Sequence, residues 1–159
     1  MTRREIESKL KSIVTGRVWS TKEVLDAFGA EFIANGVYRS VYSIKGSDKY
    51  VLKIEHEKGR VDKPPNHMNI MEYMNYIEWF RGTCYEKWLA PCYVVTYDSR
   101  IMLQARVKPA AKKDMPAKLP SFFTDKKVAN WGWYNGRIVC VDYSMIVPDQ
   151  NKMKRAIWR

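Results

Sequence analysis

The chain has 159 residues, of which 46% are hydrophobic and 13% aromatic, and its formal net charge is +11. Its length suits one domain with its own core, and the apolar content argues against disorder. The charge predicts attraction to something acidic: nucleotide phosphates, nucleic acid or an acidic protein surface.

The sequence does not indicate a membrane protein or a zinc-finger protein. No apolar run is long enough to span a membrane. The three cysteines, Cys84, Cys92 and Cys140, contain no C-x-x-C and do not combine with His56 and His67 into a zinc spacing. We therefore expect buried free thiols and a cytoplasmic protein.

Two short helices are predicted at the start of the chain. Apolar residues recur at helical spacing from Arg3 to Val14, and Gly16 ends that pattern. Ser20-Thr21-Lys22-Glu23 reads as a capping box for a second helix that ends at Gly29. The pair could be a helix-turn-helix, but the second helix carries Glu23 and Asp26 and lacks side chains that read base edges, which disfavours DNA reading.

A strand-turn-strand-turn-strand pattern follows from Phe32 to Ile54, with a turn at Lys45 to Asp48. Lys53 lies in an otherwise apolar strand, where a lysine usually points to solvent. The polar segment from Glu55 to Asn66 contains Pro64-Pro65 and reads as a linker.

The middle of the chain predicts a helix and two more strands. Asn69 to Phe80 has an apolar face made of Ile70, Met74, Ile77 and Phe80. Cys92 to Thr96 and Ile101 to Ala105 are strands that complete a small antiparallel sheet. The predicted fold class is therefore α+β.

The C-terminal third predicts a loop, a hairpin and a tail. Val107 to Pro120, with three prolines and four lysines, reads as an exposed basic loop. Asn135-Gly136 between β-forming residues predicts a type I′ hairpin, in which Trp131 and Trp133 share one face and are expected to be buried. Asn151 to Arg159 reads as a basic helix.

Polar residues at fixed spacing surround this hairpin. Asp125, Lys127 and Asn130 precede it, and Asp142 ends its second strand. Closing the turn brings Asp142 near Asn130. Because Mg²⁺ prefers oxygen ligands, an amide and a carboxylate held together predict a site for phosphate and a divalent metal.

The same spacing resembles the protein kinase-like family, whose catalytic loop reads H-R-D-x-K-x-x-N and is followed by a metal-binding D-F-G. Here Asp125-Lys126-Lys127-Val128-Ala129-Asn130 precedes Asp142-Tyr143-Ser144. The His-Arg pair is missing and the last two residues of D-F-G are replaced. The resemblance implies that Asp125 accepts or orients a hydroxyl proton, that Lys127 neutralises the γ-phosphate, and that Asn130 and Asp142 hold metal.

The resemblance extends to the first strands. It implies that Gly36-Val37-Tyr38-Arg39-Ser40-Val41 is a glycine-rich loop, in which Gly36 is the middle glycine, Tyr38 the tip aromatic and Val41 the valine packed on adenine. Ala34 and Arg39 stand where glycines are expected, so the backbone cannot wrap the phosphates as closely, although Arg39 could supply charge to a phosphate.

Further roles follow from the resemblance. Val51-Leu52-Lys53 is similar to V-A-I-K, which implies that Lys53 holds the α- and β-phosphates. The partner glutamate of that lysine would be Glu72, with Glu78 as the alternative. Gln104 to Val107 would be the hinge that meets adenine.

The implied architecture is a kinase-like N-lobe, with an antiparallel sheet and one helix, followed by a strongly reduced C-lobe. It makes residues 1–159 one compact domain, with a helical extension at 1–30, a sheet lobe at 32–106 and a reduced catalytic-loop lobe at 107–159. In this form the chain looks like the compact kinase-like proteins of tailed phages, which implies a location in the host cytoplasm.

Three functions remain open from sequence. The first is a phosphotransferase that uses ATP and Mg²⁺, with a host protein as the default substrate. The second is a non-catalytic pseudokinase that binds and inhibits an acidic host protein. The third is a nucleic-acid-binding protein, suggested by the charge and by Trp131 and Trp133.

Overall fold

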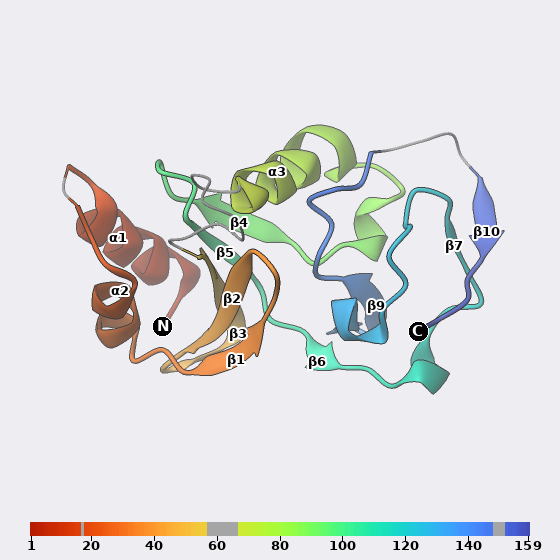
Figure 1. Ribbon diagram of the computed structural model, residues 1–159, viewed down its shortest axis with the longest axis horizontal. Helices are drawn as coiled ribbons and strands as arrows, with labels where there is room; N and C mark the ends of the chain where they lie inside the picture. Colours follow the sequence, from red (N-terminus) through yellow and green to blue (C-terminus); the bar gives the residue numbers. More distant parts are fainter. Residues whose placement is uncertain (17, 57–66, 148–151) are drawn as a thin grey trace.

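The computed structural model describes residues 1–16, 18–56, 67–147 and 152–159. Within them the fold is α+β, as predicted: three α-helices and a five-stranded antiparallel sheet, with two small sheets at the other end of the molecule (Figure 1). None of the helices in this described part is long and apolar enough to cross a membrane.

Helices α1 (Arg3–Val14) and α2 (Thr21–Phe28) cover one face of the large sheet. Thr2 caps α1 through a capping box with Glu5, and the Ser20 side chain accepts a hydrogen bond from the backbone N–H of Glu23 to begin α2. Gly29 ends α2 in the left-handed conformation, as predicted. The apolar sides of both helices pack on Ile44, Leu52, Ile54, Ile101 and Leu103 of the sheet.

The large sheet contains β1 (Phe32–Asn35), β2 (Arg39–Ile44), β3 (Ser47–Glu55), β4 (Cys92–Val95) and β5 (Ile101–Ala105) in the order β1-β2-β3-β5-β4. All neighbours are antiparallel, and Lys53 of β3 pairs with Val41 of β2 and Met102 of β5. The strands match those predicted. The predicted linker begins inside β3, at Glu55, and its residues 57–66 lie outside the described residues.

The second face of the sheet holds α3 (Met68–Met74), which continues as a wider π-helical turn over Asn75–Phe80. The predicted apolar face is right at its C-terminal end, where Phe80 is buried in the core and Ile77 packs against that core, but wrong further back. Ile70 and Ile77 are only partly buried and Met74 is 42% exposed, while Asn69, Glu72 and Asn75 point inward. The reason is that β2 and β3 present the buried cations Arg39 and Lys53 to this helix, and those charges need polar partners.

The C-terminal region forms two small antiparallel sheets. One contains β6 (Lys108–Pro109), β8 (Trp131–Tyr134) and β9 (Arg137–Cys140), and the other pairs β7 (Lys118–Pro120) with β10 (Met153–Arg155). Short 3-10 turns lie at Glu86–Trp88, Lys112–Asp114 and Val128–Asn130. The β8–β9 turn has positive φ at Asn135 and Gly136, so the predicted type I′ hairpin is confirmed.

Two predictions for this region are wrong. The tail is no helix where it is described, because its backbone pairs with β7 and Trp158 donates a hydrogen bond to the carbonyl of Pro116 over 2.9 Å. The segment from Val107 to Pro120 is not wholly exposed, because it contains β6 and β7, and Leu119 is buried in the core.

The paired tryptophans and the cysteines also differ from expectation. Trp131 is 2% exposed, but Trp133 is 38% exposed. The rings of Phe123 and Trp158 pack edge-on against Trp131, at 5.0 and 5.2 Å between centroids, whereas Trp133 lies beyond this cluster. The cysteines are free thiols, but Cys84 is exposed.

Gly132 is required by the contact between β6 and β8. A Cβ there would lie 2.4 Å from Cγ2 of Val107 and 2.7 Å from the carbonyl oxygen of Lys108. We expect Gly132→Ala to lower the free energy of unfolding by about 1–3 kcal/mol through overpacking, measured by urea unfolding. Gly16→Ala is the comparison, because Gly16 has open space around it and only a positive φ. An effect at Gly132 no larger than that at Gly16 would contradict the packing argument.

Candidate functional site

Two adjoining cavities lie between the large sheet and the β8–β9 hairpin. The first, of about 510 Å³, is lined among others by Gly36, Tyr38, Asp125, Lys127, Asn130 and Asp142. The second, of about 420 Å³, is lined among others by Val41, Val51, Lys53, Ala105, Ala129 and Val141. Every predicted site residue except Glu72 therefore lines one of them, and Glu72 lies directly behind Lys53.

Lys53 and Glu72 form a buried ion pair. Lys53 is 3% exposed and Glu72 is fully buried, and Nζ lies 2.6 Å from Oε1. Nζ also donates to the carbonyl oxygen of Val141, which ties β3 to the segment before Asp142. Glu78, the alternative partner, is exposed in the π-helical turn that follows α3.

The charge state of Glu72 is set by two opposing effects. Burial alone would raise the pKa of its carboxyl, but the positive charges of Arg39 and Lys53, together with hydrogen bonds from Lys53 and the N–H of Tyr143, hold that pKa below its ordinary value. Glu72 is therefore a carboxylate at neutral pH.

The lowered pKa of Glu72 predicts acid sensitivity. A carboxyl with a folded-state pKa below its ordinary value of 4.5 adds stability above that pH and loses it as the pH falls through the folded value. We expect the free energy of unfolding to fall below about pH 4.5, and to fall less steeply in Glu72→Gln. Urea unfolding from pH 7 to pH 3 measures this, with Glu78→Gln as the control. Equal pH profiles for wild type and Glu72→Gln would refute it.

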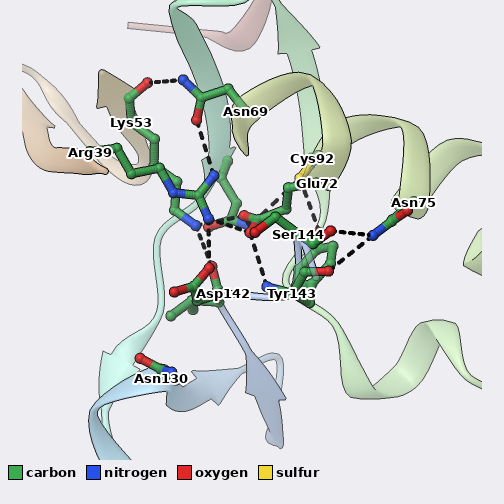
Figure 2. Close-up of polar contacts among 12 residues, drawn as sticks. Arg39, Lys53, Asn69, Glu72, Asn75, Cys92, Asn130, Asp142, Tyr143 and Ser144 are labelled. Atoms are coloured by element: carbon green, nitrogen blue, oxygen red, sulfur yellow. Dashed lines mark hydrogen bonds and ion pairs between the residues drawn. The ribbon is translucent and has the colours of Figure 1, made fainter. Parts of the chain in front are cut away.

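Arg39 has a role that the sequence did not predict. It begins β2, only 6% of it is exposed, and its guanidinium lies among three acceptors (Figure 2). Nη1 donates to Oδ1 of Asn69 over 3.1 Å, while Nη2 donates to Oε2 of Glu72 and, over 2.8 Å, to Oδ1 of Asp142. Burial opposes its charge, but Glu72 and Asp142 outweigh that and raise the pKa of Arg39.

Side chains of α3 and its π-helical turn hold the segment after β9 in place. The backbone N–H of Tyr143 donates to Oε2 of Glu72 over 2.9 Å. Nδ2 of Asn75 lies within hydrogen-bonding distance of the carbonyls of Tyr143 and Ser144 (Figure 2). It lies equally within reach of the carbonyl of Ile146. The sequence does contain an indication of this contact: the spacing of Asn69, Glu72 and Asn75 places three polar side chains on one face of the helix.

Asp125 and its neighbours form the opposite wall. Nδ2 of Asn130 donates to Oδ2 of Asp125 over 3.0 Å, and the backbone N–H of Lys127 donates to Oδ1 over 3.2 Å. Nζ of Lys127 and the guanidinium of Arg159 each lie 3.6 Å from the carboxylate. Arg159 was missed, because no sequence pattern indicates that the tail returns to this loop.

The predicted metal ligands face one cavity. Val141 donates a backbone hydrogen bond to the carbonyl of Asn130, so the hairpin holds Asp142 and Asn130 on the same wall, and both residues line the two cavities. Among the described residues, Oδ1 of Asn130 and Oδ2 of Asp142 accept no hydrogen bond. The described part of the chain also contains no group of three or more His, Cys, Asp or Glu residues that could hold a metal ion. An amide oxygen and a carboxylate oxygen are both ligand types that a hard cation prefers.

Residues of the turn between β1 and β2 line the cavities, Gly36 both of them and Tyr38 the first. The backbone N–H of Gly36 donates to the carbonyl of Arg39 over 2.9 Å, which makes the turn tight. Tyr38 lies partly exposed at this turn, and Val41 reaches the second cavity from β2.

Comparison with protein-family models, curated proteins and solved structures finds no match to this chain.

Proposed function

We propose that this chain is a compact kinase-like protein with a reduced C-lobe, and that it transfers phosphate from ATP with Mg²⁺. One observation carries the proposal: the buried Lys53–Glu72 ion pair borders a cleft that also contains Asp125, Asn130 and Asp142. A cation paired inside a cleft, opposite a set of oxygen ligands, is suited to polyphosphate.

The second cavity suits the base of the nucleotide. Apolar side chains line it from both sides, with Val41 and Val51 on the sheet and Ala129 and Val141 on the hairpin. Residues 105–107 run along its edge, where backbone groups can meet a purine. The first cavity, whose lining includes the charged side chains of Asp125 and Lys127, then receives the phosphates, because Arg39, Asn130 and Asp142 line both cavities.

The protein's own residues then have separate tasks. Lys53 binds the α- and β-phosphates, and Glu72 orients it. Asp125 takes the proton of the attacking hydroxyl, held in place by Asn130, and Lys127 offsets charge on the transferred group. When bound, Mg²⁺ at Asn130 and Asp142 would neutralise the phosphate oxygens.

Thermal unfolding with and without ATP plus Mg²⁺ tests the nucleotide site. Ligand at a hundredfold excess over its dissociation constant should add about 2.7 kcal/mol to the free energy of unfolding of the wild type. Ala129→Trp should abolish the shift by filling the second cavity from an exposed position. Ala117→Trp, exposed and outside both cavities, is the matched control. No shift in the wild type at millimolar nucleotide would refute the proposal.

A second candidate is favoured by one contact. Asp142 already forms an ion pair with Arg39, so its carboxylate is less available as a metal ligand. This arrangement favours a pseudokinase that binds an acidic host protein without catalysis. Nucleotide binding without phosphate release would support this candidate. Nucleic-acid binding stays a prediction from charge, and a steep loss of affinity with salt would be its signature.

A further inference from the structure

Arg39 occupies a position that the proposed fold would give to a glycine, and its guanidinium is built into the site. From β2, it donates to Asn69 and Glu72 on α3 and to Asp142 after the β8–β9 hairpin (Figure 2). A planar guanidinium can hold several acceptors at once, which a lysine at this position could not do.

The charges around Asp142 are already balanced. Arg39 and Lys53 carry two positive charges, and Glu72 and Asp142 carry two negative charges, all linked by ion pairs. A divalent cation bound at Asp142 would lie close to the guanidinium of Arg39, and like charges repel each other at short range. Because arginine keeps its proton in proteins, the Oδ1 atom of Asp142 that Arg39 holds becomes free only if the ion pair opens.

The two side chains differ in their freedom to move. The Arg39 side chain is 7% exposed and fixed by Asn69 and Glu72, while the Asp142 side chain is 52% exposed. Asp142 can therefore leave Arg39 for the cavity while Arg39 keeps its other acceptors. Asn130 stands apart from this network, on the hairpin side of the site (Figure 2).

We propose that Arg39 and a divalent cation compete for the carboxylate of Asp142, so that Arg39 sets the metal affinity of the site. The inference rests on the proposed function, because it assigns the cation to the same cleft. The nucleotide-free protein then binds metal weakly. Removing the guanidinium charge strengthens metal binding by about tenfold or more, and each tenfold step corresponds to about 1.4 kcal/mol.

Mn²⁺ binding to the nucleotide-free protein, followed by electron paramagnetic resonance, tests the competition. We expect Arg39→Gln to bind Mn²⁺ at least tenfold more tightly than wild type, and Arg39→Gln/Asp142→Asn to lose that gain. Arg137→Gln, an exposed arginine outside both cavities, should leave the affinity unchanged. Equal or weaker binding by Arg39→Gln, or no binding by either protein, overturns the inference.

A second measurement needs no variant, which matters because Arg39→Gln leaves Glu72 with one cation fewer. In wild-type protein, the side-chain Nε–H signal of Arg39 in nuclear magnetic resonance should shift as Mg²⁺ is added, with the shift absent in Asp142→Asn. An unmoved signal overturns the competition. Calorimetry of ATP binding to the wild type distinguishes failure of this inference from failure of the proposed function. If ATP binds but the metal does not move the Arg39 signal, only this inference is refuted. If ATP does not bind, the proposed function is refuted.

Discussion

Replacing Glu72 with alanine is expected to lower the free energy of unfolding by about 3–5 kcal/mol, because it leaves two buried cations without their shared partner. Arg39 and Lys53 both pair with this carboxylate, and the N–H of Tyr143 donates to it. Chemical unfolding in urea at pH 7 measures the change.

Glu78→Ala is the matched control for this substitution. Glu78 lies six residues further along the same helical segment and is exposed, so we expect a change within about 0.5 kcal/mol. Equal effects at the two glutamates would show that Glu72 does not organise the site.

The second large effect is expected on the rate of phosphate transfer. Asp125→Asn should reduce phosphate transfer by about 10²–10⁴-fold, because the amide cannot take a proton from the attacking hydroxyl. Phosphate release from ATP and autophosphorylation are the readouts, since neither needs an identified substrate. ATP affinity should stay close to that of wild type, because Asp125 is assigned no contact with the base or the α- and β-phosphates.

Asp114→Asn controls for the loss of a carboxylate elsewhere. Asp114 is partly buried beside β6, where it accepts a hydrogen bond from the N–H of Ala111 outside both cavities. Full phosphate transfer by Asp125→Asn would remove Asp125 from the proposed mechanism, and no transfer by wild type that nevertheless binds ATP would favour the pseudokinase.

Local signals in the sequence predicted much of the fold. The N-cap at Ser20, the stop at Gly29 and the Asn135-Gly136 turn act within a few residues, so their outcome could be inferred from neighbours alone. The hairpin also explains why Asn130 and Asp142 line the same cavities, because pairing of β8 with β9 brings Asn130 opposite Val141, the residue before Asp142.

Features that depend on distant residues could not be inferred in the same way. The buried face of α3 is polar because Arg39, thirty or more residues earlier, needs acceptors from Asn69 and Glu72. The tail forms a strand because β7 offers a free edge, and a basic sequence alone reads equally well as a helix. Arg159 lies near Asp125 because its backbone N–H donates to the carbonyl of Lys126 and its carbonyl accepts from the N–H of Val128.

Hydrogen–deuterium exchange with and without ATP plus Mg²⁺ tests most directly whether nucleotide enters this cleft. We predict protection in the β1–β2 turn, in residues 105–110 and in residues 125–142, with little change in α1 and α2, which lie on the other face of the sheet. Protection confined to another surface, or unchanged exchange throughout at millimolar ATP, would contradict the account.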